Sequence, residues 1–319
     1  MSATRQVSVA AARPAPPWPA RFLALAAIWG SSFLLIKLGD EALAPAQVAL
    51  SRVAIGSAVL LVVLAARRER LPRGVVAWRR LAVAALLLNA LPFTLFAYGE
   101  TQVTSVLAGI WNATTPLLTL LVAMAALPGE RPTRQRITGL LVGFGGVLIV
   151  LGVWRGLGGQ AVLGSLACLG AACCYGLGYP YTRLRLAGRA ESVVALAAAQ
   201  LICATVELAL VTPLLAGAPT SLTPRAVVSV VALGVLGTGL AFVLNYGLIR
   251  DAGATVASTV TYVIPLFSTL LGVLILSEPL TWNEPVGALV VILGVAVAQG
   301  RLRWPTYTAA PAAHTTRPK

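Results

Sequence analysis

The chain is poor in charged residues and nearly devoid of histidine. Asp, Glu, Lys and Arg together make up 11% of its 319 residues, whereas about a quarter of a soluble domain is charged. So few charges could not cover a soluble surface, which argues against a cytosolic enzyme. The single histidine, His314, lies in a polar tail, which removes Ser–His and Cys–His catalysis and histidine-ligated metals.

Other chemical signatures are missing as well. The four cysteines lie inside apolar stretches and predict neither a disulfide framework nor a zinc site. The two aspartates, Asp40 and Asp251, fall at helix ends on opposite sides, so an intramembrane enzyme is the least favoured alternative. The sequence has no Gly-x4-Gly-Lys-Ser/Thr loop, so direct driving by ATP is unsupported. We expect no catalytic residue, no metal and no cofactor.

The chain is rich in long hydrophobic segments. Hydrophobic residues make up 58% of it, and the mean hydropathy is +0.86. A helix that spans a bilayer needs about 20 mostly apolar residues. Ten such runs follow one another with short loops between them, at residues 22–38, 46–66, 81–98, 103–127, 137–153, 163–184, 193–215, 227–249, 255–276 and 286–299. The sequence therefore predicts an all-α integral membrane protein with ten transmembrane helices.

Basic residues give these helices an orientation. The net charge of +14 would suit nucleic acid, but the arginines sit in short runs between the spans, so we expect no nucleic-acid partner. Twenty of the 24 Lys and Arg residues fall on the side of the two termini, against two, Arg155 and Arg225, on the other side. Positive residues favour the cytoplasmic side of short loops. The sequence predicts a multi-pass protein of the cytoplasmic membrane with both termini in the cytoplasm.

The two halves of the chain resemble each other. Residues match at a nearly constant offset of 148 or 149, as in Tyr98/Tyr246, Pro116/Pro265, Glu130/Glu278, Gly139/Gly287 and Gly146/Gly294. Five spans in each half is an odd number, so the two copies should be inverted in the membrane. We expect a tail at 1–21, a first five-helix repeat at 22–153, an external linker at 154–162, a second repeat at 163–300 and a tail at 301–319, with both tails disordered and cytoplasmic.

Several motifs resemble the EamA-type transporters of the drug/metabolite transporter superfamily. They include Trp29-Gly30-Ser31-Ser32-Phe33, Arg52, Thr115-Pro116-Leu117, Ile264-Pro265-Leu266 and Ser277-Glu278-Pro279-Leu280, in that order. The resemblance covers about residues 22–300. It implies alternating-access transport of small metabolites, often export of amino acids or related compounds, and fixes no substrate. The halves differ where Tyr175 replaces the Trp of the first repeat, and where Gln200 stands 148 residues after Arg52.

Helical spacing gives candidate residues for a transport pathway. Polar groups inside a bilayer usually face protein or a water-filled cavity, although Ser, Thr and Gly at such spacings can simply serve close helix packing. We favour the cavity for the amides and aromatic rings of Asn89, Phe93, Trp111, Asn112, Asn245, Tyr246 and Tyr262. An uncharged pocket of amides and rings would suit a small amphipathic or zwitterionic solute.

The first helix of each repeat adds further candidates. Trp29 and Ser32 lie on the first helix of the first repeat, and Tyr175 and Tyr179 lie on that of the second. We predict that they are gates or walls of the substrate site and not part of an aromatic belt at the membrane interface. Pro116 and Pro265 each remove a backbone hydrogen bond at a matching place, so they predict hinges, with a tolerated kink as the alternative.

Glycines and intramembrane charges complete the set of candidate residues. Four glycines of the fifth span, Gly139, Gly143, Gly145 and Gly146, predict close helix packing and leave a homodimer open. Arg52 and Glu207 are charges well inside spans. Three interpretations stay open: the two side chains form an ion pair, Glu207 couples transport to protons, or each lies in the membrane without a charged partner.

These observations favour one function over its alternatives. We expect a secondary transporter that moves a small organic metabolite, either amino-acid-like or drug-like, across the membrane by alternating access, with export as the direction. Its partners would be the solute and the lipid bilayer. A lipid-handling protein or an accessory membrane subunit is the alternative.

Overall fold

The chain folds as a bundle of helices in the computed structural model, which describes residues 17–126, 133–152, 154, 160–186, 189, 191–219, 222–252, 260–298 and 300–302. The predicted linker at 154–162 and the two predicted tails lie largely outside these residues. No strand occurs within the described ranges. In the first half the helices are α1 (Trp18–Asp40), α2 (Pro45–Ala66), α3 (Val75–Ala85), η1 (Leu86–Ala90), α4 (Leu91–Glu100), α5 (Ser105–Asn112), α6 (Thr115–Ala126) and α7 (Arg134–Leu151).

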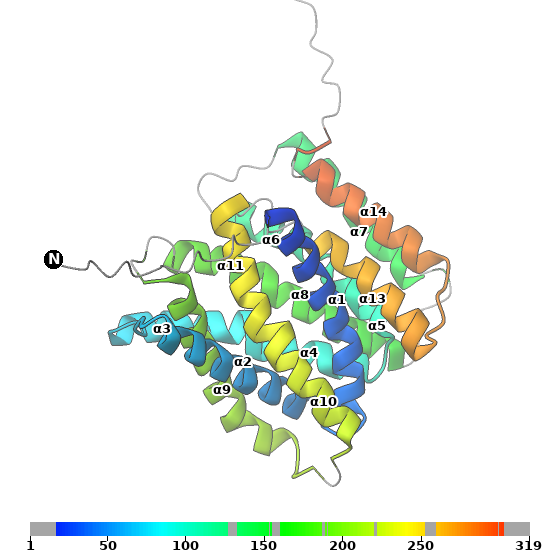
Figure 1. Cartoon of the computed structure of the whole chain (residues 1–319). Helices are drawn as coiled ribbons and strands as arrows, with labels where there is room; N and C mark the ends of the chain where they lie inside the picture. Colours follow the sequence, from blue (N-terminus) through cyan, green and yellow to red (C-terminus); the bar gives the residue numbers. More distant parts are fainter. Residues whose placement is uncertain are drawn as a thin grey trace, which may run out of the picture.

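The second half repeats this order (Figure 1). Its helices are α8 (Gln160–Arg185), α9 (Val193–Leu215), α10 (Pro224–Ala232), η3 (Leu233–Leu240), α11 (Ala241–Ala252), α13 (Val260–Leu276) and α14 (Asn283–Ala298). The segments α3–η1–α4, α5–α6 and α10–η3–α11 each form one span, so the ten predicted spans all appear as helices. Seven of the described helices are long and apolar enough to cross a membrane, and α13 and α14 are shorter apolar helices. The predicted fold class is confirmed.

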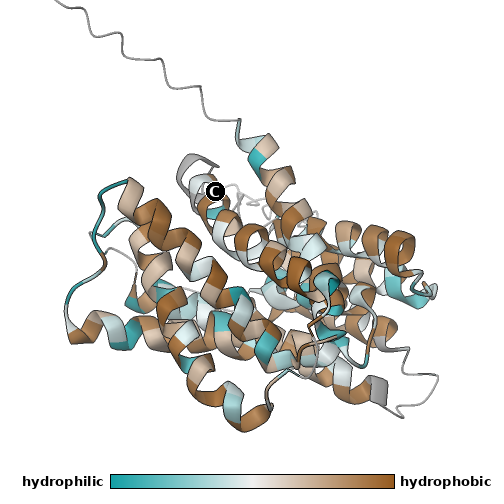
Figure 2. Cartoon of the chain, turned by 60° about the horizontal axis from the view of Figure 1, so that its bottom comes forward, coloured by the Kyte–Doolittle hydropathy of each residue, from teal (hydrophilic) through white to brown (hydrophobic). Residues whose placement is uncertain are grey.

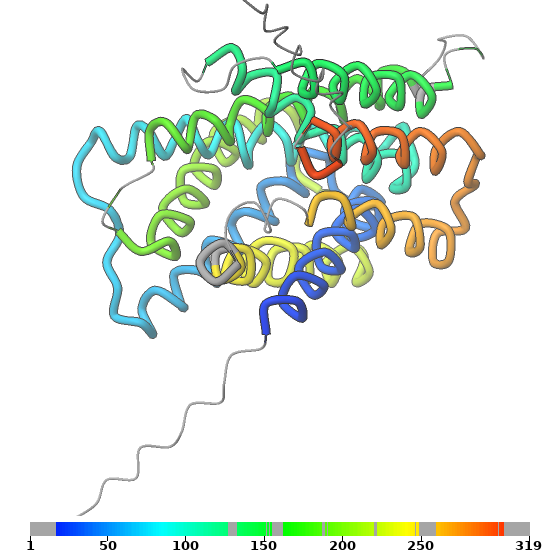
Figure 3. Tube along the Cα trace, turned by 90° about the horizontal axis from the view of Figure 1, so that it is seen from above, coloured from blue at the N-terminus to red at the C-terminus, as the bar shows by residue number. Residues whose placement is uncertain are grey.

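The two α-helices that end the repeats show the inversion directly. α7 and α14 lie side by side at one edge of the bundle (Figures 1 and 3). A Cβ on Gly146 would come 2.6 Å from the backbone nitrogen of Val291, and a Cβ on Gly287 would come 2.6 Å from that of Val150. Residues early in one helix thus face residues late in the other, so equivalent helices run antiparallel. Of the glycines predicted to serve close packing, Gly139, Gly143 and Gly146 lie against α14, whereas a Cβ on Gly145 would have nothing within 4 Å.

Apolar side chains cover the outside of the bundle as well as its core. Figure 2 shows hydrophobic residues along most helices, and many large ones are exposed on the surface of the bundle. Large residues such as Leu214, 84% exposed, and Leu274, 70% exposed, would be costly in contact with water. They suit contact with lipid tails, as expected of a multi-pass membrane protein.

Candidate functional site

A cavity of about 550 Å³ lies between the two repeats. Its lining comes from α1, α2, η1, α4, α5 and α6 of the first repeat and from α8, α9, α11 and α13 of the second. Eight residues predicted from the sequence line it: Trp29, Ser32, Arg52, Phe93, Asn112, Tyr175, Tyr179 and Asn245. The structure therefore brings together side chains that the sequence placed on six separate spans.

Other predicted residues lie elsewhere. Trp111 is 1% exposed and belongs to the core cluster of α1, α4, α5 and α13, against which Tyr262 also packs. Glu207, on α9, is half-buried and does not line the cavity. The side chain of Tyr246 lies outside the described residues. Asn89 is fully buried beside the cavity and bonds to a residue that lines it, as described below.

The two predicted hinge prolines lie in different surroundings. Pro116 stands at the second position of α6, just after the turn at 113–114 that separates α5 from α6. Pro265 lies inside α13, which continues through it as a single helix. Neither proline lines the cavity. The first repeat therefore interrupts its fourth span where the second repeat keeps a regular helix, and a hinge at either proline stays a prediction.

Aromatic rings form one wall of the cavity. Phe33 meets Phe96 edge-on with ring centroids 5.5 Å apart, and Phe96 lies 6.1 Å from Tyr175. Tyr175 in turn lies 6.2 Å from Tyr179. Because all four rings line the cavity, they offer a continuous apolar surface with quadrupoles for an aromatic or aliphatic solute.

Some polar side chains of the cavity lining have no hydrogen-bond partner among the described residues. Within the described part of the chain, the side-chain amides of Asn112 and Asn245 make no hydrogen bond. The buried hydroxyl of Thr115 also lacks a partner there. A polar group in an apolar site is costly when unpaired. The amides of Asn112 and Asn245 are therefore available to bind a solute, whereas the Thr115 hydroxyl is enclosed by protein.

Arg52 of the first repeat and Gln200 of the second each donate hydrogen bonds to the other repeat. Arg52 of α2 donates from Nε to Thr238 Oγ1 at 2.9 Å and from Nη2 to the Gly237 carbonyl at 3.3 Å. Gln200 of α9 donates from Nε2 to Asn89 Oδ1 at 2.6 Å. Gln200 stands 148 residues after Arg52, and η3 stands in the same relation to η1. Each second helix thus contacts the π-helical segment of the other repeat.

These π-helical segments were not expected from the sequence. A π-helix places its hydrogen bonds five residues apart and is found mostly as short interruptions, often at functional sites. Here the two interruptions receive the cross-repeat contacts of Arg52 and Gln200, next to the cavity. They therefore mark the place where the repeats meet in the middle of the bundle.

Arg52 makes the cavity positive rather than uncharged. Its side chain is 7% exposed, and its guanidinium carbon lies 3.8 Å from the centre of the Phe93 ring. It forms no ion pair with Glu207 or with another acid in the described residues. Arg183 also lines the cavity, whereas none of the described lining residues is Asp or Glu. The expected uncharged pocket is therefore corrected to one with two arginines.

A polar network closes one end of the cavity. The lining stops at Ile36 on α1 and at Phe96 on α4, one turn before these helices end. In that last turn, Lys37 Nζ donates to the carbonyl of Glu100 and, at 2.8 Å, to that of Val103. Ser105 Oγ donates to Glu100 Oε2 at 3.1 Å. We use the name end network for four residues: Lys37, Glu100, Ser105 and Glu278. The contacts of Glu278 are described next.

Glu278 ties the second repeat to this end network. Its carboxylate accepts hydrogen bonds from the backbone nitrogens of Ser105 at 2.8 Å and Val106 at 3.2 Å. These are the first two residues of α5, so the carboxylate caps the positive end of that helix. The contact joins the loop after α13 to the start of α5 across the two repeats.

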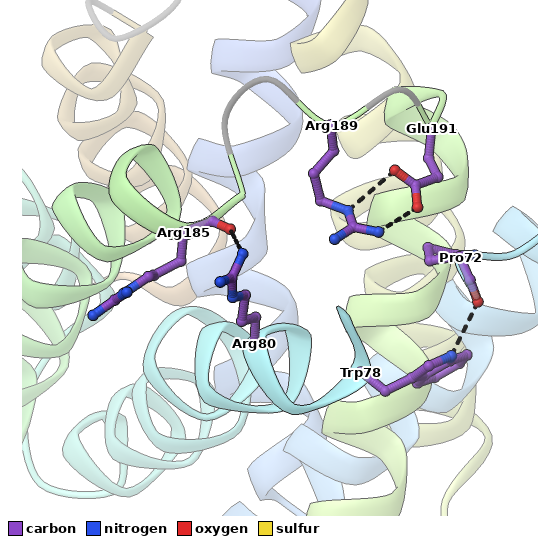
Figure 4. Close-up of polar contacts among 6 residues, drawn as sticks. All are labelled: Pro72, Trp78, Arg80, Arg185, Arg189 and Glu191. Carbon is purple, nitrogen blue, oxygen red and sulfur yellow. Dashed lines mark hydrogen bonds and ion pairs between the residues drawn. The ribbon is translucent and has the colours of Figure 1, made fainter. Parts of the chain in front are cut away.

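The cavity extends toward the opposite end of the bundle. Thr182, Arg183 and Leu186, at the end of α8, belong to its lining. Arg80 near the start of α3 donates to the carbonyl of Arg185 at 3.1 Å, which fixes this end of α8 (Figure 4). Beside it, Arg189 forms an ion pair with Glu191 and holds the pKa of that carboxyl below its usual range through their hydrogen bonds.

Some of these residues could not be singled out from the sequence. Glu278 was visible as a member of the repeat pattern, and Gln200 as a departure from it, but no pattern assigned them contacts. Lys37 and Arg183, which stand 146 residues apart, are basic residues near the ends of matching helices, and the sequence assigned neither of them a role. Their roles depend on how helices cross, which hydrophobic spacing does not encode.

Comparisons with known proteins agree with this architecture. The model of the EamA-like transporter family matches residues 18–152 and again residues 162–299. The uncharacterized transporter YoaV of Bacillus subtilis (strain 168) is 24% identical over 270 residues, which cover 84% of this chain and 91% of the relative. A solved structure, described as a crystal structure of a protein, aligns over 88% of this chain and 96% of its own with a TM-score of 0.64 and 22% identity, which shows the fold alone. The chain is a multi-pass membrane transporter and belongs to the EamA-like transporter family.

Proposed function

We propose that the protein is a secondary transporter that moves a small organic solute across the cytoplasmic membrane by alternating access. The observation that supports this most is the cavity of about 550 Å³, which both repeats line with rings and unpaired amides. Its size is within the range of small-molecule sites. The ATP-binding loop missing from the sequence leaves a solute or ion gradient as the source of energy.

In the proposed cycle the two ends of the cavity open in turn. Inverted repeats support such a cycle because each half can adopt the conformation of the other. The end network would be intact when the Glu278 end is closed and broken when that end opens. The distribution of basic residues supports a cytoplasmic position for the Arg185 end. We propose export, since the cavity extends toward that end and related transporters often export metabolites.

Transport by purified protein tests this function. The protein would be reconstituted in liposomes, and uptake of a panel of labelled amino acids, organic acids and drug-like amines would be measured against protein-free liposomes. We expect at least one solute to move faster with the protein. Asn112→Leu and Asn245→Leu should then slow its uptake or change its selectivity, because each removes an unpaired amide from the cavity.

A matched control separates the cavity from general damage. Thr119 lies one turn beyond Thr115 on α6, does not line the cavity, and bonds its hydroxyl to the Thr115 carbonyl at 2.9 Å. Thr119→Val should therefore keep wild-type uptake. Wild-type uptake by both Asn variants, with normal insertion, would contradict a role for this cavity. A panel with no transported solute would contradict the proposed function.

A further inference from the structure

Arg52 forms no ion pair in the described residues, and Glu100, the acid that acts on it electrostatically, lies outside the cavity lining. Arg52 is 7% exposed and lies about 10 Å inside the bundle from the start of α2, at a rise of 1.5 Å per residue. Burying an unpaired ion is among the most costly arrangements in a membrane protein. A charge at this position therefore calls for a partner that the described part of the chain does not supply.

The second repeat shows that a neutral residue fits the equivalent place. Gln200 stands where Arg52 would be after 148 residues, and it makes the corresponding contact with the π-helical segment of the other repeat. The contact between repeats therefore does not itself need a cation. The fold could hold glutamine at both positions, so packing alone does not account for the guanidinium of Arg52.

Arg52 keeps donors that its contacts leave unused. A guanidinium has five N–H groups, and the printed contacts involve Nε with Thr238 and Nη2 with the Gly237 carbonyl. These bonds and the Phe93 ring, which lies against one face of the group at 3.8 Å, hold its plane in place. A fixed, planar guanidinium with spare donors matches the two oxygens of a carboxylate.

The remaining lining disfavours a cationic solute. Besides Arg52, the described lining residues include Arg183 at the end of α8 and no Asp or Glu. An ammonium group would enter a positive field with no carboxylate to meet it. The wall of Phe33, Phe96, Tyr175 and Tyr179 suits an apolar body instead.

We infer that the transported solute is an organic anion with an aromatic or apolar body, whose carboxylate or similar acidic group binds Arg52. This inference rests on the proposed transport function and narrows its substrate class. It departs from a zwitterionic amino acid, because the described lining offers a cation for the carboxylate and no carboxylate for the ammonium. Arg52 would be the specificity-determining residue, with the amides of Asn112 and Asn245 as further contacts.

Binding of three matched probes tests this inference. The probes are 3-phenylpropionate, its neutral amide 3-phenylpropanamide, and the cation 3-phenylpropylamine, which share one apolar body. Binding to the purified full-length protein is measured by the rise in its thermal midpoint with probe concentration. We expect the acid to raise the midpoint at concentrations at which the amide and the amine do not. Removing one partner of a desolvated charge pair typically weakens binding by about 30-fold or more.

Three variants assign the effect to Arg52. Arg52→Gln copies the residue of the second repeat and should abolish the response to the acid, while Arg52→Lys should keep part of it. Arg225→Gln removes a charge that pairs with Glu41 on the surface, outside the cavity, and should respond as wild type. The midpoint of each variant without probe and its elution profile show whether it is folded. A loss of response in the Arg225→Gln control would show a general charge effect and overturn the assignment.

The outcomes separate this inference from the proposed function. No response to the acid, an equal response to acid and amide, or an unchanged response in Arg52→Gln would overturn the inference. The solute panel in liposomes tests transport independently. If it moves only neutral or cationic solutes, the inference fails and the transport function stands; if it moves none, the transport function fails.

Discussion

The contact of Glu278 with the start of α5 offers the sharpest test of how the cavity opens. Its carboxylate accepts two backbone hydrogen bonds there, at 2.8 and 3.2 Å, and links the two repeats at the closed end. If the ends open in turn, these bonds exist only while this end is closed. Weakening them should shift the population toward conformations open at this end.

The size of the shift follows from the bonds. A hydrogen bond to a charged group contributes about 1.5–3 kcal/mol net of water, and a neutral one about 0.5–1.5 kcal/mol. Glu278→Gln leaves one acceptor oxygen in place of two and removes the charge, so we take a loss of about 2 kcal/mol as the lower estimate. That corresponds to about a 30-fold change in the ratio of open to closed protein.

Cysteine accessibility measures this ratio. Ile36 is the last cavity-lining residue on α1 before the closed end and is 2% exposed. In a background without the four native cysteines, Ile36→Cys should react slowly with a membrane-impermeant thiol reagent applied from the outside. Adding Glu278→Gln should raise that rate by about 30-fold.

Glu284 provides the matched control for this experiment. It is the second residue of α14, just after the loop that holds Glu278, and it accepts a backbone hydrogen bond from Thr281 at 3.1 Å. Glu284→Gln should therefore leave the reaction rate at Ile36→Cys close to its starting value. Equal rates in the two glutamine variants, or no change with Glu278→Gln, would refute the view that the end network holds the cavity closed.

Three further predictions concern packing and topology. Gly146→Ala should lower the thermal midpoint, because the new Cβ would lie 2.6 Å from the backbone nitrogen of Val291 and such overpacking costs about 1–3 kcal/mol. The control Gly145→Ala, whose Cβ would have nothing within 4 Å, should keep or raise the midpoint. Gln200→Leu should destabilise the protein by about 1–3 kcal/mol by leaving buried Asn89 without its partner, and adding Asn89→Leu should recover part of that loss; additive losses in urea unfolding would argue against the pair. A cysteine at Ala218 should react with impermeant reagent from the outside of intact cells, and reaction from the cytoplasmic side alone would reverse the proposed orientation.

The sequence predicts the membrane helices and their repetition well, for a physical reason. A bilayer requires about 20 apolar residues in every span. An internal repeat is recognisable because prolines and glycines recur at matching positions in the two halves. The packing role of Gly139 and Gly146 also follows from their spacing, since small residues four or seven apart let two backbones approach. These features depend on local pattern alone.

The contacts between the repeats could not be predicted in the same way. The π-helical segments at 86–90 and 233–240 change the hydrogen-bonding register without changing the hydrophobic pattern. The difference between Arg52 and Gln200 marked a departure from the repeat, yet the structure gives them corresponding contacts. Arg52 and Glu207 both lie well inside their spans, but depth does not tell which faces of two helices meet, and the two side chains form no ion pair in the described residues.

Blocking the cavity chemically would test the central claim most directly. Asn112→Cys places a thiol on the cavity lining, and Ala218→Cys places one in the exposed loop between α9 and α10. Both would be reconstituted without native cysteines, labelled to completion with a bulky maleimide, and assayed for uptake of a solute that the wild type transports. We predict that labelling stops uptake by the Asn112→Cys protein and leaves uptake by the Ala218→Cys protein unchanged. Full uptake after complete labelling at Asn112→Cys would show that solute does not pass through this cavity.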